Sequence, residues 1–501
     1  MMEQYFSKYR DGIIGQNSTI NTPVHDEINL IYADWTASGR MYSQIEERLH
    51  QEILPFVANT HTDTNYTGSK MTYAYHKAQE IIKKHVGANT SDILISSNSG
   101  MTGVVNKFQR ILGIKIHEAF KTLIKISEED KPIVFITHME HHSNQTSWIE
   151  TLADVIVVEP DKDGLVSVAN FRHAIEAHKN RKTKIVAITS CSNVTGIITP
   201  YMDISEVIHE YNGLCFVDFA CSAPYVKIDM HPDDENNRYL DAIYFSPHKF
   251  LGGPGTTGIL VFNQSLYSNH IPDNPGGGTV DWTNPWGEHK YVDNIEARED
   301  GGTPSFLQTI KAAMCMRLKD EMGVENIQRR EEEILDIIWP ALEAIPNLHV
   351  LASKHKNRLG IISFYIDDLH YNVAVKMLND RFGIQTRGGC SCAGTYGHYL
   401  LNVTKEYSKE ITDQVNTGNC STKPGWVRFS IHPTHTNSEI QYIIQALKDL
   451  SENHQSWSTD YKIDVATGSI KHINPQASLK LENEVTEYFT KNFVQDNVEM
   501  H

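Results

Sequence analysis

Between residues 90 and 262, short apolar runs alternate with longer stretches in which apolar residues recur every three or four positions. The short runs are typical of buried strands, and the longer stretches are typical of helices with one apolar face. Strands and helices in alternation predict a mainly parallel sheet that helices cover on both faces. We expect seven strands, which lie at residues 92–96, 133–137, 154–159, 184–189, 214–219, 242–246 and 258–262.

The last two of these strands are joined by "PHKFLGGPGTT", residues 247–257. A parallel pair needs a crossover connection of about a dozen or more residues, which is usually a helix. This Gly-rich connection is too short to hold one. We therefore expect the final pair of strands to be antiparallel.

The pattern changes after residue 304. Four helical stretches are expected there with two strands between them, at residues 305–321, 325–345, 361–366, 371–382, 426–431 and 437–453. The chain thus reads as an α/β protein with a smaller C-terminal α+β domain. Its expected divisions are an N-terminal segment, a large domain, the small domain and a polar C-terminal extension of unassigned role, at 1–30, 31–304, 305–454 and 455–501.

Composition and charge narrow the classes of partner. The chain has 501 residues and a formal net charge of -17, which argues against a nucleic-acid groove or an anionic membrane surface. No apolar run approaches the roughly 20 residues that a membrane span needs. The first residues, "MMEQYFSKYRDGIIGQ", have no apolar core like that of a signal peptide. We expect a cytoplasmic protein whose seven cysteines are thiols.

Four features gather at the carboxyl ends of the predicted strands, where sheets of this kind bind ligands. Asp218 ends one strand, and Lys249 follows the next. His141 stands in "MEHHSN", and the turn "SSNSGMTG", which begins at residue 96, leads into a helix. Taken singly, each has an ordinary structural role: a cap, a solvated lysine, a capping histidine and a common helix start. Together they offer a lysine amine, a carboxylate for a pyridinium nitrogen and a cradle for a phosphate. These are the groups that pyridoxal phosphate requires.

With these motifs the chain resembles the class V aminotransferase family over about residues 28–453. That family consists of fold-type I pyridoxal-phosphate enzymes and includes cysteine desulfurases, selenocysteine lyases and molybdenum cofactor sulfurases. "SPHKFLGGPGTTGIL" resembles the family's lysine motif. The resemblance implies that Lys249 attaches the cofactor covalently and that Ser246 and His248 help to hold its phosphate.

The resemblance implies further cofactor contacts, which are carried over residue by residue. They are Met101 and Thr102 at the phosphate, His141 stacked on the ring, Asn193 beside the ring oxygen and Asp218 at the pyridinium nitrogen. "EDGGTP" resembles the stretch in which a partner subunit lends a threonine to the phosphate, here Thr303, so a homodimer is implied. We also expect Asn59 and His61 on the substrate side.

The stretch "TRGGCSCAG", residues 386–394, holds two cysteines beside an arginine. Four interpretations stay open on the residues alone: a zinc clip completed by Cys420 and His398, a labile disulfide, two buried structural thiols, or a nucleophile. Nearby cations favour the thiolate form of a cysteine.

The resemblance favours the nucleophile. In cysteine desulfurases the persulfide-forming cysteine follows an arginine by five residues, and Arg387, Gly389 and Cys392 fit that spacing. Molybdenum cofactor sulfurases carry cysteines at both positions held here by Cys390 and Cys392. Arg428 matches the arginine that grips the substrate carboxylate, and Arg387 is a second candidate for that role.

The resemblance implies a desulfurase that takes sulfur from L-cysteine, leaves alanine and a persulfide on Cys392, and passes the sulfur to an acceptor protein. No metal is expected. Two alternatives stay open. One is another reaction of the family, such as transamination, carbon–sulfur lysis or epimerisation, with Cys392 not catalytic; the other is a non-catalytic scaffold.

Three departures from the family pattern affect the choice of substrate. Cys221 stands where a glutamine is usual, and "DWTASG" (34–39) replaces asparagine-alanine-alanine-threonine. Residues 399–425 are an extra stretch, which we interpret as a lid, a docking site for the sulfur acceptor or a loop that buries the cysteines.

Overall fold

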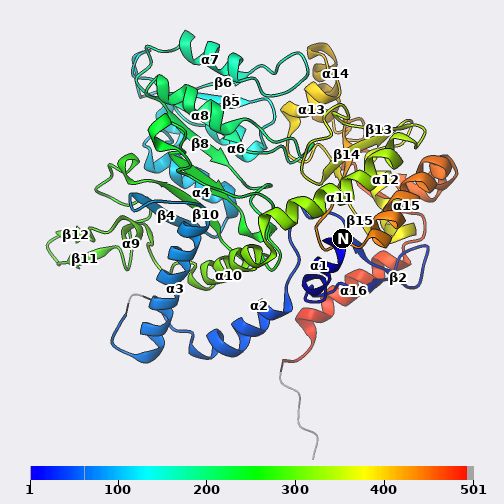
Figure 1. The fold of residues 1–501 in the computed structure, drawn as a ribbon, viewed down its shortest axis with the longest axis horizontal. Helices are drawn as coiled ribbons and strands as arrows, with labels where there is room; N and C mark the ends of the chain where they lie inside the picture. The colour runs from blue at the N-terminus through cyan, green and yellow to red at the C-terminus, as the bar shows by residue number, and fades with distance from the viewer. Residues whose placement is uncertain (1, 61, 494–501) are drawn as a thin grey trace, which may run out of the picture.

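The central element of the fold is a seven-stranded sheet (Figure 1). This computed structural model describes residues 2–60 and 62–493. Strand order is β4-β10-β9-β8-β7-β5-β6, and only β10 runs antiparallel to its neighbours. The strands are β4 (Asp92–Ser97), β5 (Ile133–Thr137), β6 (Asp154–Val158), β7 (Lys184–Thr189), β8 (Leu214–Asp218), β9 (Ala242–Phe245) and β10 (Gly258–Asn263). The seven predicted strands and the antiparallel final pair are confirmed.

Helices cover both faces of this sheet, as predicted. Successive strand residues point to opposite faces: on β5, Ile133 and Phe135 pack into one apolar cluster, whereas Val134 and Ile136 pack into another. The first cluster includes residues of α3 (Tyr66–His85), α7 (Val168–Ala177), α8 (Tyr201–Glu210) and α10 (Phe306–Met322). The second includes residues of α4 (Gly100–Ile111) and α6 (His142–Ile149).

A second, smaller sheet lies beyond α10. It has the order β13-β14-β17-β16, with every pair antiparallel. Its strands are β13 (Leu348–Val350), β14 (Ile361–Ile366), β16 (Arg387–Gly389) and β17 (Trp426–Ser430). Residues of α11 (Val324–Glu343), α12 (Tyr371–Phe382) and α15 (Asn437–Trp457) form its apolar core. The predicted strands β14 and β17 are present, whereas β13 and β16 were missed because each has only three residues.

The N-terminal residues join the second sheet's part of the molecule. β3 (Ile31–Tyr32) pairs in parallel with β15 (Ile384–Gln385), and Arg10 of α1 (Met2–Arg10) forms an ion pair with Glu439 of α15. The predicted domain boundaries stay a prediction.

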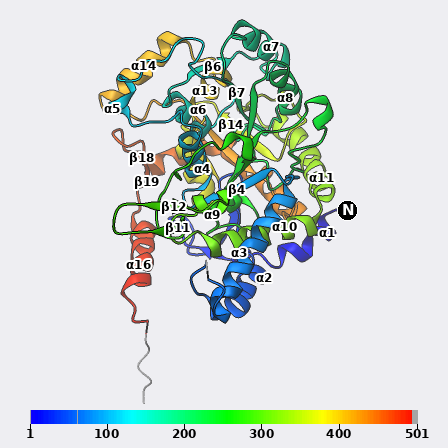
Figure 2. The ribbon, with the colours of Figure 1, turned by 90° about the vertical axis from the view of Figure 1, so that its left-hand side faces the viewer.

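Residues after α15 form a hairpin and a terminal helix, and the hairpin packs against the core of the second sheet through Tyr461 and Ile470. A hairpin of β18 (Tyr461–Ile463) and β19 (Ile470–His472) leads into α16 (Gln476–Thr490), which projects from the body of the molecule (Figure 2). The remaining short elements are β1 (Thr19–Ile20), β2 (Ile28–Asn29), α2 (Ser43–Arg48), α5 (Glu118–Lys121), β11 (Val280–Thr283), β12 (His289–Tyr291), α9 (Ile295–Glu299), α13 (Gly394–Leu400) and α14 (Lys405–Asn416).

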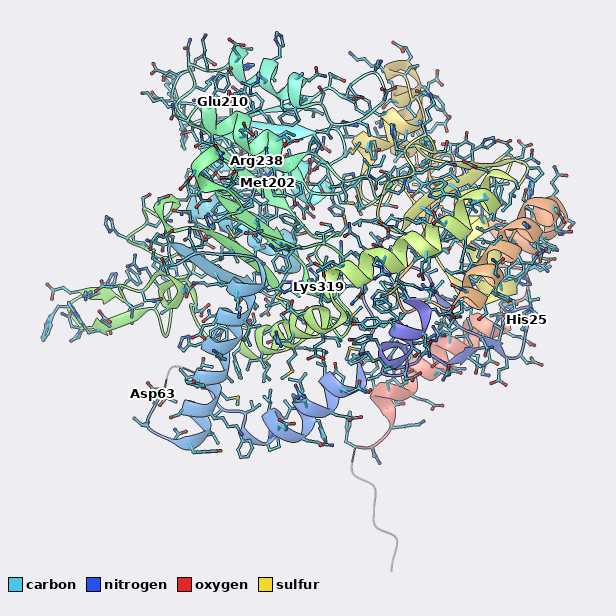
Figure 3. The ribbon with its side chains drawn as sticks, viewed as in Figure 1. His25, Asp63, Met202, Glu210, Arg238 and Lys319 are labelled. Atoms are coloured by element: carbon cyan, nitrogen blue, oxygen red, sulfur yellow. The ribbon has the colours of Figure 1, made fainter. Side chains whose placement is uncertain are left out.

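The loop after β8 is held in place by Lys319 of α10, which lies near the centre of the molecule (Figure 3). Its ammonium group donates to the carbonyl oxygens of Ala223, at 2.7 Å, and Val226, at 2.5 Å. Burial lowers the pKa of Lys319 to about 7. Through these two hydrogen bonds, Lys319 fixes the loop that follows Asp218.

Within the part of the chain that the structure describes, no helix has the length and apolar character needed to cross a membrane.

Candidate active site

A cavity of about 250 Å³ opens where the carboxyl ends of the large sheet face the second sheet. Most of the residues predicted from sequence line it. They are Met101, Thr102, His141, Asn193, Asp218, Ser246, His248, Lys249, Arg387, Cys392 and Arg428. Residues more than 300 positions apart in the chain therefore meet in one small space.

One end of the cavity is formed by the start of α4. The Met101 N–H donates to Ser246 Oγ at 2.9 Å, and the hydroxyls of Thr102 and Ser143 lie 2.7 Å apart. A helix start presents free N–H groups and the positive end of its dipole, which suits an anion such as a phosphate. A Cβ at residue 258 of β10 would lie only 2.1 Å from the carbonyl oxygen of Gly100, so glycine at 258 permits this close approach.

A carboxylate and an amine face the middle of the cavity. Asp218 is buried at the end of β8 and accepts the Ala220 N–H at 2.7 Å. Burial raises the pKa of Asp218 to about 6, which leaves the group mostly ionised at neutral pH. Lys249 follows β9, and desolvation lowers its pKa. An amine in this environment loses its proton more readily than an exposed lysine.

His141 serves both as a helix cap and as part of the cavity wall. Its Nδ1 accepts the Ser143 N–H at 3.1 Å at the start of α6. Burial, together with nearby Lys249, lowers the pKa of His141 to about 3. The ring is therefore neutral at neutral pH. Because Nδ1 is an acceptor, the ring proton lies on Nε2.

The opposite side of the cavity carries two guanidinium groups. Arg387 and Arg428 are directly opposed partners on β16 and β17, so both side chains leave the same face of the sheet. Arg428 is buried and donates to the backbone oxygen of Asn193 at 3.0 Å and to Asp34 Oδ1 at 2.8 Å. Arg387 is exposed at the mouth of the cavity.

The two cysteines frame a strained turn after β16. Ser391 and Cys392 both have left-handed backbones, with φ of 51° and 57°. For residues with a side chain this costs about 1–2 kcal/mol each. Three neighbouring groups hold the turn: the His142 N–H donates to the Cys392 oxygen at 2.7 Å, Asn193 Nδ2 to the Ser391 oxygen at 2.8 Å, and Trp426 Nε1 to Ser391 Oγ at 3.2 Å.

This turn sends the two thiols to different surroundings. Cys392 lines the cavity, whereas Cys390 packs against an apolar cluster that includes Met139, Tyr396 and Trp426. Both are free thiols. Strained backbone is typical of functional sites, and here it turns one thiol toward the lysine and the arginines.

These observations coincide with what comparison of the chain with known proteins finds. The model of the aminotransferase class-V family matches residues 31–443. The chain belongs to the class V aminotransferase family. Relatives include a probable cysteine desulfurase of Halalkalibacterium halodurans, 28% identical over 383 residues, which are 74% of this chain and 87% of the relative. A probable cysteine desulfurase of Staphylococcus epidermidis is 28% identical over 428 residues, 84% of this chain and 92% of that one.

Solved structures share the fold. The apo cysteine desulfurase from Thermococcus onnurineus NA1 superposes with a TM-score of 0.70 at 20% identity, over 89% of this chain and 98% of its own. The Escherichia coli cysteine desulfurase CsdA, in an S-sulfonic acid form, gives a TM-score of 0.68 at 17% identity and the same coverage. The expected fold-type I architecture is confirmed.

Class V aminotransferases are pyridoxal-phosphate enzymes, and the cavity has the polar groups that this cofactor needs. Among the described residues, three buried atoms of cavity residues lack a hydrogen-bond partner: Asn193 Oδ1, Thr36 Oγ1 and Arg428 Nε. Buried polar atoms are rarely left unsatisfied, so these atoms point to a polar ligand. With the α4 cradle, Asp218 and Lys249, the residues present fit pyridoxal phosphate.

Two predicted residues lie elsewhere, and a third is not described. Asn59 and Thr303 are exposed, and neither lines the cavity of this chain. His61 lies outside the described residues. For all three, the predicted role stays a prediction.

Sequence reasoning missed several cavity residues. Ser143, whose hydroxyl meets Thr102 at the α4 end, stands in "MEHHSN", where attention to small hydroxyl residues could have found it. Thr36 lines the cavity and Asp34 contacts it through Arg428; both stand in "DWTASG", the stretch noted only as a departure from the family pattern. Cys221, which the sequence had marked as a departure from the family pattern, was not missed: it lines the cavity, and its thiol donates to the Cys191 oxygen at 2.9 Å.

Within residues 2–60 and 62–493, no group of three or more His, Cys, Asp or Glu side chains is placed to hold a metal ion. His398, one of the two residues considered for a zinc clip, hydrogen-bonds within its own segment, to the Gly394 oxygen and to Ser408 Oγ, each at 2.8 Å.

Proposed function

We propose that this protein is a pyridoxal-phosphate-dependent cysteine desulfurase that converts L-cysteine to alanine and a persulfide on Cys392. The observation that carries the proposal is the placement of one thiol of the pair, Cys392, in the same cavity as Lys249 and Arg428. Relatives named probable cysteine desulfurases, at 28% identity over most of the chain, support it.

The cavity residues divide the work of holding the cofactor. The start of α4, with Thr102, Ser246 and His248, would take the phosphate, and Asp218 would pair with the ring nitrogen. His141 would lie against the ring. When bound, pyridoxal phosphate acts as an electron sink for the charge left when the substrate loses its α-proton.

Lys249 is the residue placed to move that proton. Its lowered pKa makes the amine a better general base near neutral pH. Arg428 and Arg387 would orient the substrate through its carboxylate, since a planar guanidinium binds a carboxylate with two parallel hydrogen bonds. This grip would present the substrate's β-carbon and its sulfur toward Cys392.

The sulfur step takes place at Cys392. Its thiolate attacks the substrate sulfur, so an S–S bond forms as the C–S bond breaks. The electron pair of the C–S bond stays with the β-carbon, which takes up a proton and leaves as the methyl group of alanine. The substrate sulfur is oxidised to the persulfide level and the carbon is reduced, so no outside redox partner is needed.

We further propose that the enzyme is a cytoplasmic homodimer that hands its persulfide sulfur to an acceptor protein. Thr303 would complete the phosphate site of the partner subunit, which agrees with its exposure here. The seven cysteines are free in the described structure, as suits a reducing compartment.

The test is to add L-cysteine to the purified, cofactor-loaded protein. We expect cofactor absorbance in the visible range and alanine and persulfide in equal amounts. Cys392→Ala should keep the absorbance and lose both products. Retention of the full reaction by Cys392→Ala would instead assign a lyase or aminotransferase reaction, and failure to bind the cofactor would disprove the Lys249 assignment.

A further inference from the structure

A carboxylate of the protein lies against the arginine that would grip the substrate. Arg428 Nη2 donates to Asp34 Oδ1 at 2.8 Å, and the two side chains are 3% and 18% exposed. The two residues are 394 positions apart in the chain. A buried guanidinium without a counter-charge is costly, and this ion pair offsets that cost for Arg428.

Asp34 also uses up hydrogen-bonding capacity on Arg428. A two-pronged grip on a carboxylate needs two adjacent N–H groups of the guanidinium. Nη1 donates to the Asn193 oxygen at 3.0 Å and Nη2 donates to Asp34. Within the described residues, only Nε has no partner. The guanidinium has five N–H groups, so Arg428 keeps N–H groups to offer, but an incoming carboxylate would share the cation with the Asp34 carboxylate and be repelled by it unless Asp34 yields its place.

The backbone of Asp34 is fixed, so the segment around residue 34 does not move away and carry the carboxylate off Arg428. Residue 34 forms a parallel bridge with Ser430 of β17. Its carbonyl oxygen accepts the Ala37 N–H at 2.9 Å and the Tyr32 hydroxyl at 3.2 Å. Rotation of the Asp34 side chain would free Arg428 without moving this backbone.

Arg387 does not remove this competition. It extends from the neighbouring strand into the mouth of the same cavity, and no ion pair within the described residues neutralises it. A carboxylate that enters thus meets one free cation at the mouth and one neutralised cation inside.

We propose that Asp34 competes with the substrate's carboxylate for Arg428 and so sets how tightly the site holds small carboxylic acids. Calling that carboxylate the one on L-cysteine rests on the proposed function. The competition itself rests on the ion pair. By this inference Asp34 is a specificity-determining residue that weakens binding of simple carboxylates.

The experiment uses propionate as a probe and propionamide as its uncharged counterpart, titrated calorimetrically into cofactor-loaded and cofactor-free protein. Asp34→Asn is nearly isosteric and keeps an oxygen that can accept from Arg428. We expect it to bind propionate at least about tenfold more tightly than wild type, with propionamide unchanged. Equal or weaker binding of propionate, or none at all, would overturn the proposal.

Two further variants test whether the effect belongs to Asp34 and Arg428 in particular. Asp26→Asn makes the same charge change at an exposed position and should leave propionate binding as in wild type. Arg387→Met should weaken propionate binding in both the wild-type and the Asp34→Asn protein. The ratio of the two propionate affinities should stay the same. If that ratio collapses to one, Arg387 is the contested cation and the assignment to Arg428 is wrong.

The titration separates this proposal from the desulfurase proposal because it needs no turnover. Tighter propionate binding by Asp34→Asn in a protein that makes no persulfide would support the competition and disprove the desulfurase. Persulfide formation with unchanged propionate binding would do the reverse.

Discussion

The two sides of the cavity are built in different ways. The cofactor wall, as it is called here, consists of Asp218, which ends a strand of the large sheet, and of Lys249 and His141, which each follow such a strand within a few residues. Arg387, Cys392 and Arg428, here called the sulfur wall, belong to a small sheet and a turn with two left-handed residues. The first wall takes its geometry from the ends of buried strands. In the second, strands β16 and β17 place the two arginines, whereas the turn with Cys392 is held by a few hydrogen bonds from neighbouring segments.

This difference has a functional consequence. The turn of the sulfur wall is held partly by Asn193 and His142, which belong to segments that build the cofactor wall. Lesions in the cofactor wall should therefore abolish all chemistry. Lesions in the sulfur wall should leave the cofactor bound and affect substrate binding, through the arginines, or the sulfur step, through Cys392.

The largest effect should come from breaking the cofactor wall with Lys249→Ala. Without this amine no group in the cavity attaches the cofactor or takes the α-proton, so turnover should fall by at least about a thousandfold. Cofactor absorbance and alanine formation measure this. Lys227→Ala, at an exposed lysine, is the control. Activity within tenfold of wild type in Lys249→Ala would contradict the assignment.

The next largest effect should come from Cys392→Ala in the sulfur wall. Because the thiol supplies the nucleophile, persulfide and alanine formation should also fall by about a thousandfold or more, while the cofactor stays bound. Cys390→Ala, two residues away and packed in an apolar cluster, should change turnover by no more than about threefold. A larger loss in Cys390→Ala than in Cys392→Ala would reverse the roles of the two thiols.

A smaller effect should come from His142→Ala, which loosens the link between the walls. His142 Nε2 accepts the Gly394 N–H at 3.0 Å, just beyond the cysteine turn. Loss of this bond should cost about 1 kcal/mol of stability and slow the sulfur step roughly tenfold, with cofactor absorbance unchanged. Single-turnover kinetics would show it, and His142→Gln, which keeps an acceptor, should recover part of the rate. A loss of cofactor binding in His142→Ala would mean that the walls are not separable.

The smallest effect should come from Glu331→Gln, in α11 beneath the second sheet. Burial raises the pKa of Glu331 from 4.5 to about 8. Because the pKa of Glu331 is higher in the folded state than in the unfolded state, the protonated carboxyl contributes its full stability below pH 4.5. This contribution is lost as the pH rises through about 8. Between pH 5 and 9, the free energy of unfolding of wild type should fall by about 1–3 kcal/mol more than that of Glu331→Gln.

Thermal unfolding across that pH range would measure the difference. Glu332→Gln, at the exposed neighbouring position, should behave like wild type. Parallel curves for wild type and Glu331→Gln would show that Glu331 does not hold its proton in the folded state.

The two walls also differ in how far they follow from sequence. Strand β8 and Asp218 could be placed because a continuous apolar run ends at a carboxylate, and Lys249 could be placed by its motif. For the sulfur wall, the sequence offered only the spacing between Arg387 and Cys392. Strand β16 has no apolar side chain that would indicate a strand, and no periodicity predicts the left-handed backbone of Ser391 and Cys392. In the extra stretch at 399–425, helix α14 carries Tyr407, Ile411 and Val415 at helical spacing, but it has no buried residues, so its apolar pattern does not reveal where it lies in the fold.

The contact of Asp34 with Arg428 lay beyond sequence reasoning for a different reason. It joins the first and last parts of the fold through side chains, across 394 positions. Local propensity and hydrophobic periodicity carry no information about such a pair. Only the folded structure shows which carboxylate meets which guanidinium.

The central claim is that one thiol of the pair, the one that faces the cavity, carries the sulfur. The most direct measurement is mass spectrometry of the cofactor-loaded protein after a single turnover with L-cysteine, with thiols blocked and peptides fragmented to separate Cys390 from Cys392. The account predicts one added sulfur atom on Cys392 and none on Cys390. Added sulfur on Cys390, or on neither residue while alanine is formed, would contradict it.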